Sequence, residues 1–308
     1  MAAVIVCIWG MNFVVMKWGL REFTPFQLAA ARFALASLPF MLFVGRPALP
    51  WRLLLLYGGL QGVGQFGFLF TALKVGMTAS LASVLMQTQV FFTAMLGVLL
   101  LGERIGPAQR VGMVLAALGI VCFTMHFVAI NPVNTQTNGL VGIKTGLSTA
   151  SDVTALGFLL ALGAAASWAA ANVVARHAQA ANANYDPLQF VVWTSAVPVL
   201  PLLAMSALAD SPDQHANWLK ASVAAWAAAA YLALFATVWA YTMWTKLLKR
   251  HAASKVSPFG LAVPMVGLTA GTLLLGESIS AWQWAGVACV AAALLATVLG
   301  PKYLGQSR

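Results

Sequence analysis

Charged residues are scarce in this chain of 308 residues. Asp, Glu, Lys and Arg together make up 8% of the sequence, whereas soluble domains carry about 25%. Hydrophobic residues make up 61%, and the mean hydropathy is +0.86. A soluble globular fold cannot cover so much apolar surface with so few charges. The composition therefore excludes that class and predicts a protein whose solvent is lipid.

Cysteine and histidine are too few and too scattered for a metal or redox centre. The three cysteines, Cys7, Cys122 and Cys289, each fall inside a long apolar run and are typical of small buried hydrophobic residues. The four histidines lie near the ends of such runs, at His126, His177, His215 and His251. Neither set has the spacing of metal ligands or a nucleophile paired with a base. We therefore expect a protein that is not an enzyme and that uses no metal and no cofactor.

Acidic residues are missing from the interior of every long apolar run. The seven in the chain are Glu22, Glu103, Asp152, Asp186, Asp210, Asp213 and Glu277. A proton-coupled exporter of cationic drugs normally places a carboxylate inside the membrane. The sequence therefore predicts transport without an intramembrane carboxylate proton relay, either facilitated or coupled by a route that the sequence does not show.

What the chain does have is apolar segments long enough to cross a bilayer, which takes about 20 residues. Ten can be counted, near residues 2–20, 26–44, 53–73, 79–101, 108–128, 155–176, 187–208, 219–245, 253–275 and 281–300. Runs of this length without polar alternation exclude a β-barrel. The sequence predicts an all-α, polytopic membrane protein with ten transmembrane helices.

Basic residues give a net charge of +10, but most of them lie at the ends of the predicted helices, which argues against a nucleic-acid partner. With the N-terminus inside, all but six of the 17 Lys and Arg residues fall on the cytoplasmic side. The six exceptions are Lys17, Arg21, Arg32, Lys74, Lys144 and Lys220. The positive-inside rule therefore predicts that both termini are cytoplasmic. The expected partners are the lipid bilayer and a small-molecule substrate; the oligomeric state is not fixed, and a monomer is compatible with the sequence.

The chain also repeats itself. Leu99–Glu103 reappears unchanged as Leu273–Glu277, and at the same offset of 174 residues Ala79-Ser80 matches Ala253-Ser254. Five predicted spans in each copy is an odd number, so the two copies enter the membrane from opposite sides. We expect two inverted five-helix repeats, over residues 1–128 and 153–308, joined by an external loop over 129–152.

The two copies also open alike, with Trp9-Gly10-Met11-Asn12 in the first and Trp168 followed by Asn172 in the second. Together with the two Leu-Gly-Glu closures, this resembles the EamA family of the drug/metabolite transporter superfamily. The segments Trp9–Lys17, Gln65–Phe70 and Gln87–Thr93 are similar to bacterial exporters of cysteine, O-acetylserine and other amino acids. One departure is Val90, where many family members carry proline; the second copy keeps Pro264.

The resemblance implies an inner-membrane exporter of small amino acids and their derivatives, by alternating access around a central cavity. It implies that the first four helices of each copy enclose this cavity and that the fifth of each is peripheral. A broader specificity that includes aromatic amino acids stays open. So do an exchanger of other metabolites, such as nucleotide sugars or phosphorylated compounds, and drug efflux on the same fold.

Polar residues at membrane depth are the candidates for substrate binding. Gln61 and Gln65 lie on one face of the third predicted helix, and the repeat aligns them with Phe235 and Trp239 of the eighth. Amides from one copy and aromatic rings from the other would suit a small zwitterion. The alternative is that the amides hydrogen-bond between helices and the aromatic rings only pack.

Further candidates lie on the helices that open and close the repeats. Gln89 pairs with Thr93 one helical turn later. Asn12 forms a stripe with Trp9 on the first predicted helix, and Trp168 with Asn172 forms the corresponding stripe on the sixth. Each of these can bind substrate or fix a helix crossing. The carboxylates of Glu103 and Glu277 follow apolar helices, and we expect them to cap the next helices at Ile105 and Ile279.

Arg32 is the most specific single candidate. It lies seven residues past Pro25, about 10 Å into its helix, and its aligned partner is Thr194, so the repeated scaffold does not require a charge there. A guanidinium at this depth can bind a substrate carboxylate through two hydrogen bonds. The alternative is that its side chain extends to the outer lipid headgroups.

Overall fold

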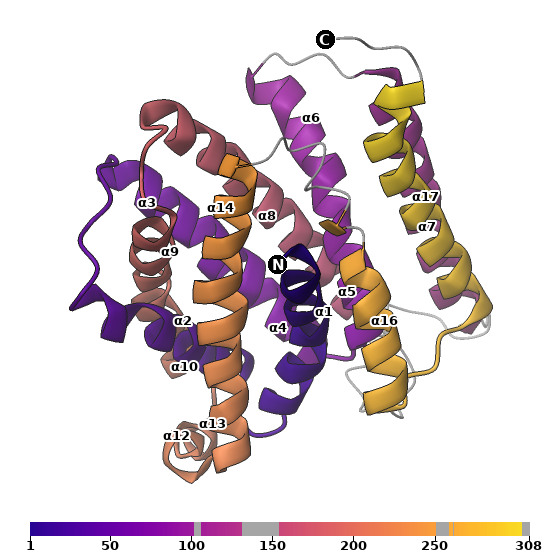
Figure 1. Cartoon of the computed structure of the whole chain (residues 1–308). Coiled ribbons are helices and arrows are strands. Elements are labelled where there is room, and N and C mark those ends of the chain that lie inside the picture. The colour runs from indigo at the N-terminus through magenta and orange to yellow at the C-terminus, as the bar shows by residue number, and fades with distance from the viewer. Residues whose placement is uncertain (102–105, 131–153, 251–258, 261, 304–308) are drawn as a thin grey trace.

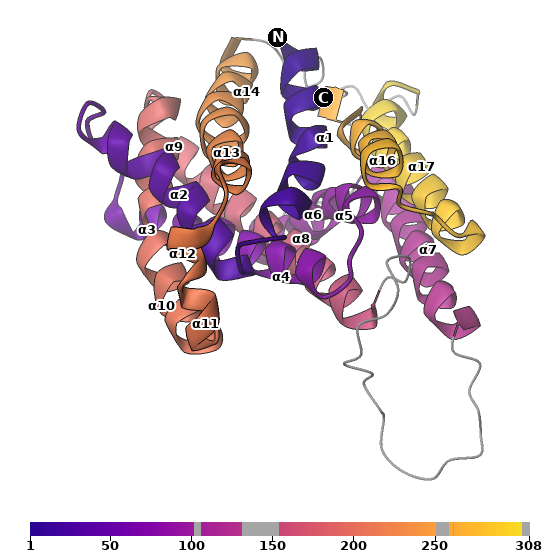
Figure 2. The same cartoon turned by 90° about the horizontal axis from the view of Figure 1, so that it is seen from below.

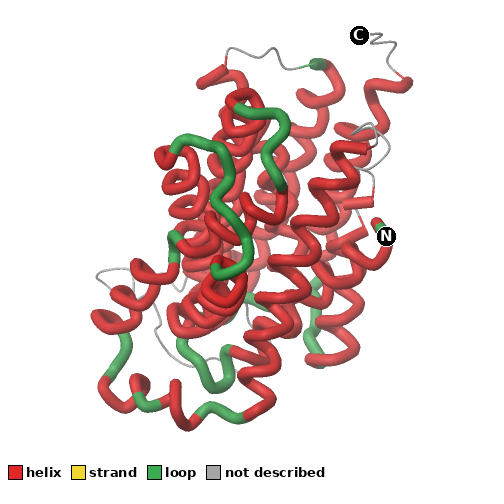
Figure 3. The backbone as a smooth tube through the Cα atoms, turned by 60° about the vertical axis from the view of Figure 1, so that its left-hand side comes forward, coloured by secondary structure: helices red, strands yellow, loops and turns green. Residues whose placement is uncertain are grey.

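The computed structural model describes residues 1–101, 106–130, 154–250, 259–260 and 262–303, and the regular elements over these ranges are helices joined by short loops (Figure 3). The first half contains α1 (Ala2–Gly19), α2 (Pro25–Met41), α3 (Trp51–Gly58), η1 (Gly59–Phe66), α4 (Gly67–Lys74), α5 (Ala79–Leu85), η2 (Met86–Thr88), α6 (Gln89–Leu101) and α7 (Pro107–Ile130). The second half contains α8 (Ala155–Ala181), α9 (Pro187–Ala196), α10 (Val199–Ala209), α11 (Pro212–His215), α12 (Asn217–Lys220), α13 (Val223–Ala230), η3 (Tyr231–Trp239), α14 (Ala240–Arg250), α16 (Ala262–Leu275) and α17 (Ala281–Tyr303).

Eight helices in the described part of the chain are long and apolar enough to cross a membrane when contiguous pieces are taken together. They are Ala2–Gly19, Trp51–Lys74, Ala79–Leu100, Pro107–Met125, Ala155–Ala181, Pro187–Ala209, Val223–Leu247 and Ala281–Val298. Two of the ten expected spans do not meet this measure: α2 has 17 residues, and α16 has 14. The start of the ninth expected span, residues 253–258, lies outside the described residues, as does the expected external loop at 131–152.

The helices of the two halves begin in similar ways. Thr24 caps α2, accepting a hydrogen bond from the Gln27 amide at 3.2 Å while the Gln27 side chain bonds back to the Thr24 amide. Asp186 caps α9 by accepting from the backbone of Leu188 at 2.7 Å. A proline occupies the first turn of each helix, where its missing N–H costs nothing.

Two long helices change to a wider π-helical pitch in mid-course, at η1 and η3. The repeat-related pairs Gln61/Phe235 and Gln65/Trp239 all fall in these two segments. Within η1, the backbone carbonyl of Leu60 accepts a hydrogen bond from a side-chain hydroxyl, that of Ser167, at 2.7 Å. Such π-helical turns redirect side chains and are common at functional sites.

The helix pair α7 and α17 stands at one end of the bundle, and α2, α3 and α9 lie towards the other (Figures 1 and 2). Gly112, Gly119 and Gly286 let α7 and α17 approach closely, since a Cβ on Gly119 would lie 3.1 Å from the carbonyl oxygen of Gly286. The position of this pair agrees with the expectation that the fifth helix of each copy is peripheral.

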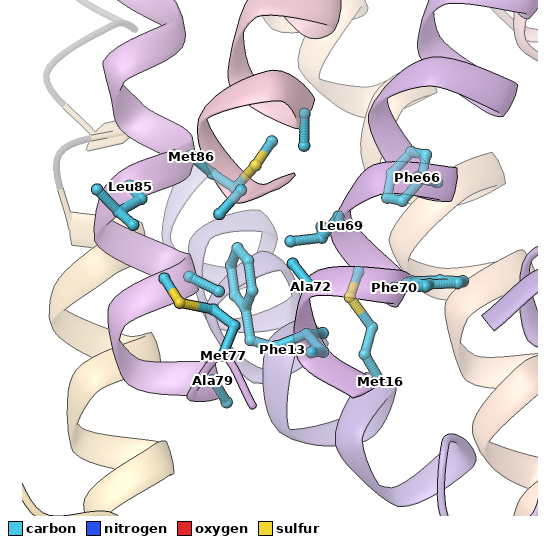
Figure 4. Packing of buried hydrophobic residues seen from close by; sticks show 14 of the residues in the cluster. Phe13, Met16, Phe66, Leu69, Phe70, Ala72, Met77, Ala79, Leu85 and Met86 are labelled. Carbon is cyan, nitrogen blue, oxygen red and sulfur yellow. The ribbon is translucent and has the colours of Figure 1, made fainter. Parts of the chain in front are cut away.

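The main apolar core runs between α1, α4, α5 and α8. Figure 4 shows Phe13 and Met16 of α1 gathered with Leu69 and Phe70 of α4. Nearer the start of α1, Gly10 lies against Val266 of α16, where a Cβ on the glycine would overlap the valine side chain. Helices from the two halves of the sequence therefore interleave in one core.

The expected cap by Glu277 is wrong in its target. Its carboxylate accepts hydrogen bonds from the backbone amides of Ala79 at 2.7 Å and Ser80 at 2.8 Å, at the start of α5, rather than from the helix after Ile279. The closing motif of the second copy thus caps the Ala-Ser step of the first, because the fold brings α5 and α16 together. Glu103 lies outside the described residues.

Candidate functional site

Arg32 lies inside the bundle, with 1% of its surface exposed. Its Nε donates a hydrogen bond to Thr237 Oγ1 at 2.9 Å. The guanidinium carbon lies 3.9 Å from the ring centroid of Phe66, a cation–π contact. The alternative that this side chain extends to the outer headgroups is therefore wrong.

Two π-helical segments hold the guanidinium. Phe66 is the last residue of η1, and Thr237 lies within η3. The Thr237 hydroxyl that accepts from Arg32 donates in turn to Leu232 O at 2.8 Å, five residues earlier. The local change of pitch in each half thus places one partner of Arg32.

Several buried polar side-chain atoms lack a hydrogen-bond partner. Among the described residues, the buried side-chain atoms without a hydrogen bond are Asn12 Oδ1, Arg32 Nη1, Gln61 Oε1, Gln65 Oε1 and Thr242 Oγ1. Buried polar groups in native proteins are nearly always paired, so each such atom calls for an explanation. Four of these five atoms belong to residues that the sequence indicated as binding candidates, namely Asn12, Arg32, Gln61 and Gln65. The atom of Arg32 is the charged one.

A cavity of about 20 Å³ lies next to the two residues that contact the Arg32 guanidinium. Its lining consists of Phe33, Tyr57, Gly58, Gln61, Gly62, Phe66, Val191, Thr194, Ser195, Thr237 and Tyr241. The lining includes both partners of the guanidinium, Phe66 and Thr237. This volume admits one water molecule but not an amino acid.

Tyr241 joins the polar groups around this cavity. Its phenol lies near Arg32 and near the amides of Gln61 and Gln65. On its other side, the Trp9 ring centroid is 5.2 Å from that of Tyr241. The Trp9 indole also donates to Ala236 O at 3.1 Å, within η3. Trp9 therefore supports the cavity wall from α1.

A second polar cluster lies between α6 and α8. Asn172 Nδ2 donates to Gln89 Oε1 at 2.7 Å and lies 3.3 Å from Thr93 Oγ1. Thr93 Oγ1 donates to the same Gln89 oxygen at 3.3 Å. The structure thus brings together three of the predicted residues, but they bond to one another.

The predicted aromatic residues lie elsewhere. Phe235 is 52% exposed and packs on Tyr231, with ring centroids 5.8 Å apart. Trp239 is half-buried and is not among the residues that line the cavity. Trp168 packs against the main core. Their contact with substrate stays a prediction.

Sequence reasoning missed Tyr57, Phe66, Thr237 and Tyr241. Thr237 and Tyr241 are one α-helical turn apart and sit in a run that is otherwise apolar, so the sequence offers little to separate them from packing residues. The spacing of residues along this helix gives little indication that Thr237 faces Arg32, because the π-helical pitch of η3 changes which side chains share a face.

Comparisons with known proteins agree with this architecture. The EamA-like transporter family model matches residues 1–125 and 155–299. The chain is 36% identical to a probable amino-acid metabolite efflux pump of Salmonella typhimurium strain LT2, over 97% of this chain and 94% of that protein. It is 35% identical to a protein with the same description from Escherichia coli strain K12, over 98% and 95% of the two chains.

A solved crystal structure has the same overall fold, with a TM-score of 0.61 at 16% sequence identity, and the similarity covers 99% of this chain and 97% of that one. The family match spans most of the chain in two segments, and the bacterial relatives exceed 30% identity over nearly their full length. Eight apolar helices in the described part agree with a multi-pass membrane protein. This chain belongs to the EamA-like transporter family.

Proposed function

We propose that this protein exports small amino acids and their derivatives across the inner membrane. In this proposal α2 and α16 complete ten transmembrane helices in two inverted repeats, over 1–128 and 153–308, with both termini in the cytoplasm. The two repeats rock about the cavity near Arg32, which opens alternately to each side. The observation that carries the proposal is the buried guanidinium of Arg32, which has an unpaired nitrogen and whose partners Phe66 and Thr237 line the cavity.

Each polar group around the cavity has a role in this proposal. Arg32 binds the substrate carboxylate through two charge-assisted hydrogen bonds. Gln61, Gln65 and Asn12 have unpaired amide oxygens that accept hydrogen bonds from the substrate's ammonium. The cluster of Asn172, Gln89 and Thr93 fixes α8 against α6 as the cavity opens.

The coupling in this proposal uses no carboxylate relay inside the membrane. The acidic residues that the structure describes are Glu22, Asp186, Asp210, Asp213 and Glu277, and each lies outside the eight candidate spans. Facilitated flux down the substrate gradient therefore fits these residues better than exchange of protons for cationic drugs. A carrier of phosphorylated metabolites is less well supported, since a dianion calls for more than the one buried guanidinium.

Counterflow in proteoliposomes tests the proposal. Vesicles loaded with unlabelled substrate should take up labelled L-alanine, L-serine, L-cysteine or L-phenylalanine, with no response to an imposed pH gradient. Arg32→Gln should lower the rate at least tenfold, because each charged hydrogen bond to the carboxylate contributes about 1.5–3 kcal/mol. Arg21→Gln is the matched control, since Arg21 is exposed in the loop after α1.

Each of three outcomes would contradict a different part of the proposal. Absence of flux for all four amino acids would reject the substrate class. Full activity of Arg32→Gln would reject the binding site, and a strong response to the pH gradient would reject transport without a proton relay.

A further inference from the structure

The charge balance around Arg32 is one-sided. The guanidinium is 1% exposed, and the described acidic residues all lie outside the candidate spans. Its hydrogen bond goes to a neutral hydroxyl, and its other close partner is the ring of Phe66. An ion held away from water without a counter-ion is unfavourable, so the site carries an uncompensated positive charge that a bound anion would neutralise.

We propose that this site recognises the carboxylate of its substrate and does not require the ammonium, so that α-hydroxy acids isosteric with its amino acids bind at least as well. This inference rests on the proposed function, because it names the part of the substrate that Arg32 selects. It extends the substrate class from zwitterions to small monocarboxylates.

The geometry of the guanidinium agrees with a carboxylate occupant. Nε is held by Thr237, whose own hydroxyl is fixed on Leu232 O, and the ring of Phe66 covers one face. Of the two terminal nitrogens, Nη1 is buried without a hydrogen-bond partner, so we assign this end of the guanidinium to the ligand. That end matches the two oxygens of a carboxylate in a parallel, two-bond arrangement.

The amides near the site do not distinguish an ammonium from a hydroxyl. The unpaired oxygens of Gln61 and Gln65 are neutral acceptors, so they can accept from the O–H of a hydroxy acid as well as from an N–H of an amino acid. An ammonium also brings a second positive charge close to Arg32, where the low dielectric strengthens the repulsion. The net gain from the ammonium is therefore small, while loss of the carboxylate leaves the guanidinium unpaired.

Three ligands of equal shape separate these contributions: L-alanine, which is a zwitterion, L-lactate, which is an anion, and L-alaninamide, which lacks the carboxylate. Binding is measured on the full chain in detergent, from the rise in thermal unfolding temperature with ligand concentration. We expect L-lactate to half-saturate within about threefold of L-alanine or below it, and L-alaninamide to bind at least about thirtyfold more weakly. In Arg32→Gln this preference for the carboxylate should disappear; its unfolding temperature without ligand shows whether it folds.

The same trio, tested as competitors of labelled L-alanine counterflow, separates this inference from the proposed function. If L-alanine is transported but L-lactate neither binds nor competes, or if L-alaninamide competes equally, the inference is wrong and amino-acid transport stands. If L-lactate binds but no amino acid is carried, the amino-acid proposal is wrong and carboxylate recognition stands. A repeat with L-phenylalanine, L-3-phenyllactate and L-phenylalaninamide covers larger side chains, and failure of both trios to bind or be carried would reject both statements.

Discussion

Two groups of polar side chains lie inside the helix bundle, and they differ in whether their hydrogen bonds are completed. Near Tyr241, which lines the cavity, Arg32, Gln61 and Gln65 each keep a buried atom without a partner. Between α6 and α8, Asn172, Gln89 and Thr93 bond to one another at 2.7–3.3 Å. Both groups consist of residue types that are costly in lipid, so their presence alone does not identify a binding site.

The difference teaches how to separate binding from packing in such a bundle. A polar cluster that satisfies itself contributes to stability and offers a ligand little. A cluster with unpaired atoms beside a cavity lowers the stability of the folded state until a ligand or water supplies the missing partner. The comparison therefore predicts opposite responses to mutation: binding changes at the first group and stability changes at the second.

After that of Arg32, the largest effect is expected at Gln65, which is 2% exposed. Gln65→Leu removes an amide oxygen that has no partner but also the contact of this amide with the Tyr241 phenol, so the two effects oppose each other and the unfolding temperature should change little. The substrate concentration for half-maximal counterflow should rise by up to about tenfold, which corresponds to about 1.4 kcal/mol. Thermal unfolding and counterflow are measured on the same preparation.

Gln87→Leu is the matched control for that substitution. The Gln87 amide donates to Gly260 O at 3.0 Å, so its loss should lower the unfolding temperature and leave the half-maximal concentration unchanged. If the two glutamines respond alike, the distinction between unpaired and paired amides fails.

A smaller effect is expected at the self-bonded cluster. Asn172→Leu should lower the free energy of unfolding by about 1 kcal/mol, since one side-chain hydrogen bond typically contributes that amount. Because Asn172 and Gln89 share that bond, Asn172→Leu, Gln89→Leu and the double variant should show a coupling of about 0.6 kcal/mol, with about 1.7 as the upper range for membrane proteins. Additive losses, or a raised half-maximal concentration with unchanged stability, would move this cluster into the binding site.

The sequence was sufficient for the all-helical class and for one contact between candidate side chains. The long apolar runs place several helices within a few residues, as at the predicted starts 26 and 187 for α2 and α9, which begin at Pro25 and Pro187. The pairing of Gln89 with Thr93 followed from helical spacing alone. Such local features depend on neighbours in the chain, which the sequence displays directly.

The contacts of Arg32 could not be predicted in the same way. Its partners Phe66 and Thr237 come from η1 and η3, where the change of pitch rotates the side chains away from the faces that a regular helix would give them. The cap by Glu277 was predicted on the wrong helix for a related reason. The backbone amides that donate to it, those of Ala79 and Ser80, are nearly two hundred residues away and meet it only through the packing of α16 on α5.

The smallest effect is expected at Glu22, an exposed carboxylate whose hydrogen bonds are formed at the surface. It serves as a reference for the two buried clusters. Glu22 is exposed and accepts from the backbone amide of Ser222 at 2.6 Å and from its hydroxyl at 2.7 Å. These two hydrogen bonds, the backbone one first, lower the pKa of the Glu22 carboxyl below its ordinary value. A lowered folded-state pKa means that the contact stabilises the fold above the unfolded-state pKa, about 4.3, and that this contribution is lost as the pH falls through the folded-state pKa.

Unfolding temperatures of wild type and Glu22→Gln should therefore differ slightly at pH 7 and converge as the pH falls through the lowered folded-state pKa of Glu22. Counterflow should be equal at pH 7, because Glu22 caps α13 from the loop after α1 and lies far in the chain from the cavity residues of η1 and η3. A larger loss of stability here than at Asn172 would mean that burial does not set the strength of these contacts. The contrast between the cavity group and the self-bonded group would then need a cause other than the completion of hydrogen bonds inside the membrane.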